Sequence, residues 1–131
     1  MSKYTIPHVA IIVNNLEETK EFYQKIGFSV LDEIYLKEKQ RKFLLLEGYG
    51  LQIEAFFYIN DDHDNKADQN QKRTGIMHFA VACENIEVVR DMIASKNVSL
   101  HKDISTSTGG IVLFFVEDPS GILVEFVEFP K

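Results

Sequence analysis

Two histidines occupy matching places in two apolar segments of this 131-residue chain. His8 lies in IPHVAIIV, and His78 lies 70 residues further on, in IMHFAVAC. Glu54 in QIEAF and Glu125 in LVEFV interrupt two further apolar segments. A carboxylate or an imidazolium is costly to bury among apolar side chains unless it is paired or bound to a cation. Two imidazoles and two carboxylates form a ligand set that suits a divalent zinc, nickel, cobalt, iron or manganese ion.

Two interpretations account for these four polar residues. In the first, one divalent cation binds all four side chains, and solvent completes its coordination shell. In the second, each half of the chain holds its own His–Glu pair, which stabilises one sheet without a metal. The first interpretation is preferred, because separate structural pairs do not explain why the same residue types recur at matching positions.

The segments that carry the histidines and glutamates are repeated along the chain. Segments that begin at Ile6 and Ile76 share six identical residues in 25 aligned positions. The residues that recur are Ile6, His8, Ala10, Asn15, Glu17 and Ser29. Towards the end of each half, GLQIEAF and GILVEFV match at a spacing of 71 residues. The sequence therefore predicts two similar modules with one histidine and one glutamate each.

Each module has the pattern of a strand, a helix and three further strands, in the order βαβββ. The apolar runs 6–13 and 76–83 are typical of buried strands. Asn15 is predicted to cap the first helix, with Glu18 three residues later. Gly27 and Asn97 are predicted to end the two helices in the left-handed conformation. The remaining strands are expected near residues 28–36, 41–47, 51–58, 98–104, 110–117 and 122–128, with the last turn at Pro119, Ser120 and Gly121.

Helical spacing predicts an apolar face on each helix. On the first helix this face comprises Leu16, Thr19, Phe22, Tyr23 and Ile26. On the second it comprises Ile86, Val89, Met92 and Ile93. Both faces are expected to pack on the sheet of their own module.

A polar stretch, NDDHDNKADQNQKRT, separates the two modules. Its composition is typical of a solvated linker, in which His63 is expected to be exposed. The predicted organisation is an N-terminal module at 1–59, a linker at 60–74 and a C-terminal module at 75–131.

Strand alternation predicts which side chains accompany the candidate ligands. Gln52, Phe56 and Tyr58 share a face of their strand with Glu54, and they are predicted to line a substrate pocket. Packing in the core is the alternative role for these three side chains.

Composition narrows the classes of partner. The net charge is −6 and no run of basic residues occurs, so nucleic acid is not expected as a partner. The single cysteine, Cys83, precludes an intrachain disulfide and fits a reducing compartment. No segment approaches the roughly 20 apolar residues that cross a bilayer, and the N-terminal residues lack the pattern of a signal peptide. We therefore expect a cytoplasmic protein with no membrane partner.

The pattern resembles the vicinal oxygen chelate superfamily, which includes glyoxalase I, extradiol dioxygenases and the fosfomycin- and bleomycin-resistance proteins. The resemblance covers nearly the whole chain and rests on IPHVAIIVNNLEETKEFYQKIGF, LQIEAFF, GIMHFAVACENIE and FVEDPSGILVEFVE. It implies an α+β fold in which two tandem βαβββ modules form a cup-shaped mixed β-sheet with the helices outside. In this family the metal cup forms either within one chain or across a dimer, and the resemblance implies a homodimer.

The resemblance also implies a set of site residues and a reaction. The family's ligand positions map onto His8, Glu54, His78 and Glu125, a set similar to that of bacterial glyoxalase I. We expect one divalent metal ion, with zinc or nickel favoured. The implied activity is that of a lyase or isomerase that acts through an enediolate on a small oxygen-chelating substrate. Glu54 or Glu125 is the expected proton acceptor.

Two other functions stay open within this resemblance. An extradiol-type dioxygenase would need ferrous iron, and a fourth protein ligand would crowd its oxygen site. A non-catalytic protein that binds a small molecule such as an antibiotic is the other alternative, although such members generally lack the ligands. Glutathione-dependent glyoxalases commonly carry an arginine four residues after the first ligand. Ile12 occupies that position here, which argues against glutathione as a cosubstrate.

Overall fold

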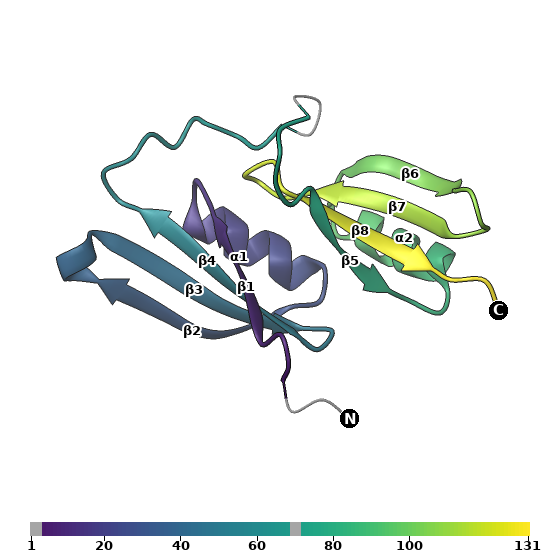
Figure 1. The fold of residues 1–131 in the computed structure, drawn as a ribbon, viewed down its shortest axis with the longest axis horizontal. Coiled ribbons are helices and arrows are strands. Elements are labelled where there is room, and N and C mark those ends of the chain that lie inside the picture. The colour runs from purple at the N-terminus through teal and green to yellow at the C-terminus, as the bar shows by residue number, and fades with distance from the viewer. Residues whose placement is uncertain (1–3, 69–71) are drawn as a thin grey trace. The chain divides into compact units, whose positions relative to one another are not determined.

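The structure is a computed structural model that describes residues 4–68 and 72–131 (Figure 1). The chain divides into two compact units, Met1–Asn65 and Lys66–Lys131, so the division falls inside the polar stretch 60–74. Each unit has the predicted order of elements, βαβββ. The predicted α+β fold class is confirmed.

The first unit is a four-stranded mixed sheet with one helix. Its elements are β1 (His8–Ile12), α1 (Leu16–Lys25), β2 (Ser29–Leu36), the 3₁₀ turn η1 (Lys37–Lys39), β3 (Arg41–Gly48) and β4 (Leu51–Tyr58). The strand order is β1-β4-β3-β2, and β1 pairs with β4 in parallel. The other neighbouring strands are antiparallel.

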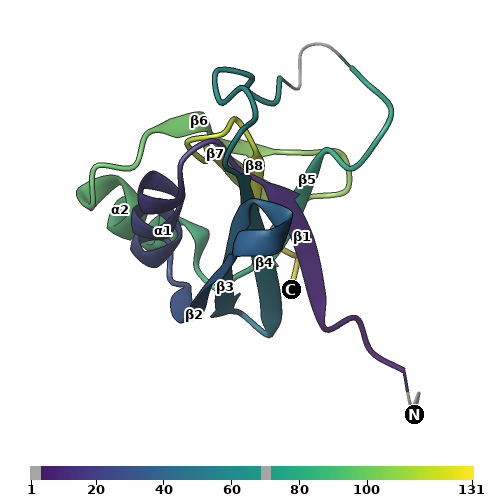
Figure 2. The ribbon, with the colours of Figure 1, turned by 90° about the vertical axis from the view of Figure 1, so that its left-hand side faces the viewer.

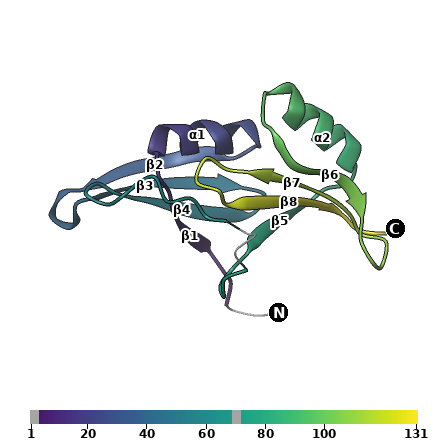
Figure 3. The ribbon, with the colours of Figure 1, turned by 90° about the horizontal axis from the view of Figure 1, so that it is seen from above.

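The second unit repeats this topology. Its elements are β5 (His78–Ala82), α2 (Ile86–Ser95), β6 (Leu100–Thr106), β7 (Val112–Glu117) and β8 (Leu123–Glu128). The strand order is β5-β8-β7-β6, and β5 pairs with β8 in parallel. Figures 2 and 3 show each helix on one side of its own sheet. Within residues 4–68 and 72–131, no helix is long and apolar enough to cross a membrane.

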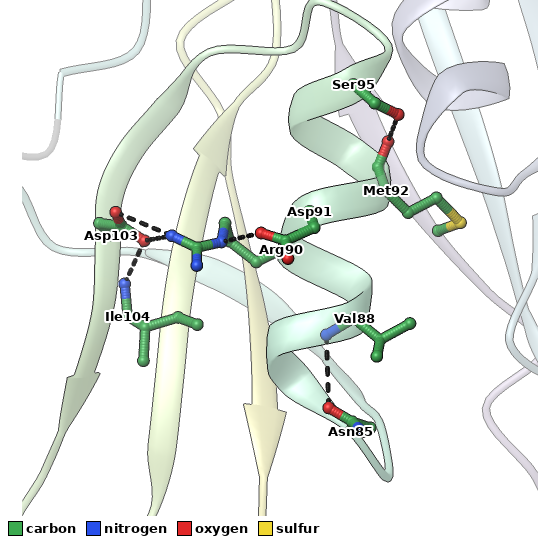
Figure 4. Close-up of polar contacts among 8 residues, drawn as sticks. All are labelled: Asn85, Val88, Arg90, Asp91, Met92, Ser95, Asp103 and Ile104. Carbon is green, nitrogen blue, oxygen red and sulfur yellow. Dashed lines mark hydrogen bonds and ion pairs between the residues drawn. The ribbon is translucent and has the colours of Figure 1, made fainter.

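The first helix begins, and both helices end, as predicted. Asn15 Oδ1 accepts a hydrogen bond of 2.9 Å from the backbone N–H of Glu18, and Asn85 makes the equivalent bond in α2 (Figure 4). Gly27 and Asn97 follow the helices with φ of +108° and +63°, so both adopt the left-handed conformation. This conformation turns the chain from each helix into the next strand.

The predicted apolar face of α1 is confirmed, because Leu16, Thr19, Phe22, Tyr23 and Ile26 are all buried. In α2, Ile86 and Ile93 are buried, but the prediction for Met92 is wrong, since its side chain is 41% exposed. Met92 lies about 100° around the helix from Ile93. On the side of α2 next to β6, Arg90 binds Asp103 with an Nη1–Oδ1 distance of 2.9 Å (Figure 4).

Each helix covers one face of its sheet, where alternate strand residues form the core. The fully buried strand residues in the first unit are Leu44, Leu46, Ile53 and Ala55. Their counterparts in the second unit are Phe114, Val116, Val124 and Phe126, none more than 1% exposed. We call the opposite surface of each sheet the far face. Strand residues of the opposite parity, including the histidines and glutamates singled out above, point to it.

The polar stretch is attached to both units. The His63 ring stacks on Phe57 with 4.3 Å between centroids, and its Nε2 lies 2.6 Å from the carbonyl oxygen of Tyr58. The prediction that His63 is exposed is therefore wrong, because an aromatic ring and a backbone acceptor at the end of β4 hold it. Further along, the backbone N–H of Ala67 donates to Ser120 in the second unit.

The turn between β7 and β8 determines where the strand with Glu125 begins. Asp118 is only 3% exposed, and its Oδ1 accepts hydrogen bonds from the backbone N–H groups of Ser120 and Ile122, at 2.8 and 2.9 Å. Gly121 has a φ of +86°, and a Cβ there would meet the carbonyl oxygen of Ala67. Asp118 therefore defines this turn through its side-chain acceptor, and Gly121 through its backbone conformation.

Replacing Asp118 with alanine should lower the free energy of unfolding by about 2–3 kcal/mol, because two backbone N–H groups lose a charged acceptor. Urea denaturation followed by circular dichroism measures the change. The exposed Asp61→Ala serves as the control and should change stability by less than about 0.5 kcal/mol. Equal stability of the two variants would contradict this role for Asp118.

Candidate metal centre

The first candidate pair lies on neighbouring parallel strands of the first unit. In the register of β1 and β4, Ala10 is opposite Glu54 and His8 is opposite Gln52, so His8 and Glu54 are diagonal neighbours on the far face. The distance from His8 Nε2 to Glu54 Oε1 is 3.6 Å. The side chains are 43% and 26% exposed.

The second pair repeats this arrangement in the second unit. Ala80 is opposite Glu125 in the register of β5 and β8, which places His78 at the same diagonal offset. The distance from His78 Nε2 to Glu125 Oε1 is 3.5 Å, with exposures of 27% and 15%. The ring of Phe115 meets the His78 ring edge-on, with 5.1 Å between centroids.

The two separations suit metal ligands better than hydrogen-bonded partners. Both exceed the roughly 2.7–3.2 Å of an ordinary N–H···O hydrogen bond. Two ligand atoms bound at about 2.0–2.1 Å to one tetrahedral metal ion lie about 3.4 Å apart, which is close to the observed distances. An imidazole nitrogen and a carboxylate oxygen are also donors that zinc and nickel accept. The residues in each unit therefore fit half of a divalent-metal site.

The second ring nitrogen of His78 has no partner that the local structure supplies. Its Nδ1 is shielded from solvent and has no hydrogen-bond partner among residues 4–68 and 72–131. A histidine that serves the core alone normally satisfies its buried ring nitrogens, because an unsatisfied one costs about 1–3 kcal/mol. The side chain of His78 is thus not explained by local hydrogen bonding.

The four polar side chains are not fully buried in either unit taken by itself. The helix covers the other face of the sheet, so all four side chains keep part of their surface exposed. Within either unit, the described residues contain no cluster of three or more His, Cys, Asp or Glu side chains suited to a metal ion. Each unit therefore supplies two candidate ligands, and the complete set of four stays a prediction.

The three predicted pocket residues, Gln52, Phe56 and Tyr58, alternate along β4 with the buried Ile53 and Ala55. They therefore share the far face with Glu54, and all three are partly exposed. Phe56 also contacts Phe43 on β3, with 5.1 Å between the ring centroids. Their role in binding a substrate stays a prediction.

Sequence reasoning missed one residue on this face, Arg41. It begins β3 and lies opposite Tyr58 in the strand register. Its Cζ lies 4.7 Å from the centre of the Phe56 ring. Within KEKQRKF, Arg41 looks like one charge of a solvated turn. Strand alternation could have identified it. Arg41 is two residues before Phe43 and four before Leu45, so these three side chains point to the same face of β3.

Comparison with known proteins places the chain in a broad group. A model of the "Glyoxalase/Bleomycin resistance protein/Dioxygenase superfamily" matches residues 5–126. The "Probable lactoylglutathione lyase, chloroplastic" of Arabidopsis thaliana is 25% identical over 123 residues, which cover 92% of this chain and 35% of that protein. This chain therefore spans about a third of the plant relative's length.

Two bacterial proteins match over nearly their full length. The "Probable lactoylglutathione lyase" of Vibrio cholerae is 26% identical over 130 residues, which cover 98% of this chain and 93% of that protein. The crystal structure of a glyoxalase family protein from Enterococcus faecalis has a TM-score of 0.84 and 28% identity. That match covers 98% of this chain and all of the other. The similarity thus extends over both units.

Cys83 follows β5 and is the single cysteine of the chain. Burial and the nearby Glu128 carboxylate raise the pKa of the Cys83 thiol above its ordinary value. Its Sγ lies 3.5 Å from the carbonyl oxygen of Val127, which it approaches as a donor. A raised pKa keeps the thiol protonated at neutral pH, which makes it a poor nucleophile and a poor metal ligand.

The alkylation rate of Cys83 should therefore rise at a higher pH than the alkylation rate of an unperturbed thiol. The rate with iodoacetamide, measured against pH by mass spectrometry, should reach half its maximum at a higher pH than the rate for N-acetylcysteine methylamide, a blocked cysteine without a carboxylate. Glu128→Gln removes the neighbouring negative charge, so this midpoint should move to lower pH. A midpoint at or below that of N-acetylcysteine methylamide would contradict the raised pKa.

Proposed function

The chain belongs to the glyoxalase/bleomycin resistance protein/dioxygenase superfamily, and on this premise we propose that it is a divalent-metal-dependent isomerase or lyase. Its substrate is a small molecule with two neighbouring oxygens. The observation that carries the proposal is the repeated His–Glu pair, at 3.6 Å in one unit and 3.5 Å in the other. Two independent His–Glu pairs that only stabilise their own sheets would not need to share the same geometry.

We propose His8, Glu54, His78 and Glu125 as the ligand set for one divalent cation, with zinc or nickel favoured. Each unit contributes one imidazole and one carboxylate to this set. Two carboxylates balance the charge of a divalent cation, while two neutral imidazoles add donors without further charge. The bound cation supplies Lewis acidity, which polarises the oxygens of a substrate and makes the adjacent C–H group more acidic.

The carboxylates provide the proton transfer. Glu54 or Glu125 accepts the proton from the substrate carbon, so that a C–H bond breaks and a carboxylic O–H bond forms. The same group then returns the proton to the neighbouring carbon, which completes an isomerisation with no external oxidant or reductant. Glu54 is the more exposed of the two carboxylates, at 26% against 15%, and is the better placed to reach a substrate.

Aromatic side chains near Glu54 favour this chemistry. Phe56 follows Glu54 by two residues on the same face of β4 and packs against Phe43. Apolar rings beside a carboxylate exclude water from the reacting carbon, which strengthens electrostatic interactions there.

The proposed activity does not require glutathione. Ile12 is 66% exposed and lies opposite Phe56 in the register of β1 and β4. An apolar side chain at this place offers no positive charge to the carboxylate of a glutathione cosubstrate. We therefore propose a lyase or isomerase of glyoxalase type that acts on a different thiol adduct or on a thiol-free substrate.

Purified protein should contain about one divalent metal ion for each set of four ligands. Elemental analysis after dialysis measures this content, and analytical ultracentrifugation gives the number of chains per particle, for which we propose a homodimer. His78→Ala should lower metal affinity by at least about tenfold, because the metal loses one of its four proposed ligands. Glu54→Gln should abolish isomerisation of hemithioacetals made from methylglyoxal and several thiols.

The matched control is His101→Ala. His101 is exposed and lies 4.0 Å from Glu117, so this variant removes a histidine beside a glutamate at a site outside the proposed set. It should keep the metal content and activity of the unaltered protein. Equal metal content in His78→Ala and the unaltered protein, or no metal in either, would refute the proposed ligand set. Oxygen consumption with a catechol in the iron-loaded protein would instead indicate a dioxygenase.

A further inference from the structure

We infer that Arg41 binds an anionic oxygen group of the substrate, a carboxylate or a phosphate. The inference rests on the proposed function and narrows its substrate class. The substrate would carry its two neighbouring oxygens at one end and the anionic group at the other. Glu54 and Arg41 would then contact opposite ends of the same molecule.

The guanidinium of Arg41 is held against two aromatic rings. Its Cζ lies 4.7 Å from the centroid of Phe56 and 6.0 Å from that of Tyr58. Nη1 lies 3.4 Å from the hydroxyl oxygen of Tyr58, at the long limit of a hydrogen bond. Stacking on aromatic faces restricts the orientation of the guanidinium and leaves its edge free to donate hydrogen bonds. The side chain is therefore positioned before any ligand arrives.

The positive charge of Arg41 is not neutralised within the described part of the chain. No carboxylate of residues 4–68 or 72–131 forms an ion pair with it, and its Nε is shielded from solvent without a hydrogen-bond partner. Arg90, by contrast, forms an ion pair with Asp103, with 2.9 Å between Nη1 and Oδ1. In a chain with a net charge of −6, a partly buried guanidinium without a carboxylate is unexpected. A ligand with an oxyanion would neutralise this charge.

The position of Arg41 relates it to the candidate ligands of the same unit. Phe56, over which the guanidinium lies, is two residues from Glu54 on the same face of β4. Two residues of a strand span about 7 Å. A substrate that reaches from Glu54 to Arg41 therefore separates its chelating oxygens from its anionic group by a few bonds. Glu54 and Arg41 both lie on the far face of the first sheet.

The next residue, Lys42, provides a matched control. It is also cationic, but it alternates to the other side of β3, where its Nζ lies 5.6 Å from the Tyr35 ring. Replacing Lys42 changes the net charge by the same amount as replacing Arg41. Any general effect of charge on anion binding should therefore appear equally in both variants.

Calorimetric titration of the nickel-loaded protein with matched ligands tests the inference. The three probes are 2-oxoglutarate, its phosphonate analogue 2-oxo-4-phosphonobutyrate, and 2-oxopentanoate, which lacks the distal anion. At least one of the first two should bind about tenfold more tightly than 2-oxopentanoate, as expected for a charge-assisted bidentate contact. Tighter binding of 2-oxoglutarate would identify the anionic group as a carboxylate, and tighter binding of the phosphonate would identify it as a phosphate.

Arg41→Met should reduce this preference to less than about twofold, and Lys42→Met should retain it. Arg41→Lys keeps the charge but loses the two-pronged donor, so it should retain only part of the preference. Thermal denaturation and metal content should be unchanged in all three variants, which separates this outcome from misfolding or loss of the metal. Equal binding of all three probes, or a preference that survives in Arg41→Met, would overturn the inference.

A second measurement does not depend on the metal. The Nε–Hε resonance of Arg41 is followed in metal-free protein during titration with glutarate and with inorganic phosphate. A saturable shift that Lys42→Met retains supports the anion site, even if metal analysis refutes the proposed ligand set. No saturable shift with either anion would overturn the inference, whether or not the protein binds metal.

Discussion

The parallel pairing of the first and last strands in each unit is the constraint on which the candidate site depends. β1 beside β4, and β5 beside β8, bring together histidines and glutamates that are far apart in the sequence. In a parallel pair, side chains of matching parity point to the same face. The offset of two residues between His8 and Ala10, the partner of Glu54, therefore decides that the imidazole and the carboxylate meet. The same offset between His78 and Ala80 repeats the result in the second unit.

The single helix of each unit divides its sheet into two chemically different faces. Ile53 and Ala55 meet the helix side and are fully buried, while Glu54 and Phe56 alternate to the far face. In the first unit, polar groups can be carried on the far face because the fully buried strand residues lie on the other side. This division also explains how Arg41 can be positioned by aromatic rings without weakening the core. In the first unit, the fully buried residues and the proposed ligand thus occupy opposite faces of β4.

Much of the fold could be predicted because its signals are local. Asn15 and Asn97 act through their own backbone neighbours, so residue type and position were sufficient to identify the helix start and end. The errors arose where packing mattered. Met92 fits an apolar helical pattern, yet the orientation of α2 leaves it partly exposed. His63 stands in a polar stretch, but it stacks on Phe57 at the end of β4, a contact that composition cannot indicate.

The sequence by itself determined the repeat, the order of elements and the residue types that alternate with core positions. These properties follow from periodicity, which is contained in neighbouring residues along the chain. Only the tertiary structure decided that His8 Nε2 and Glu54 Oε1 lie 3.6 Å apart, and that Arg41 lies over Phe56. Both results depend on the register between strands, because a shift of one residue would turn one partner to the opposite face. Register is set by turns and by the packing of the whole sheet, so alternation along a single strand does not reveal it.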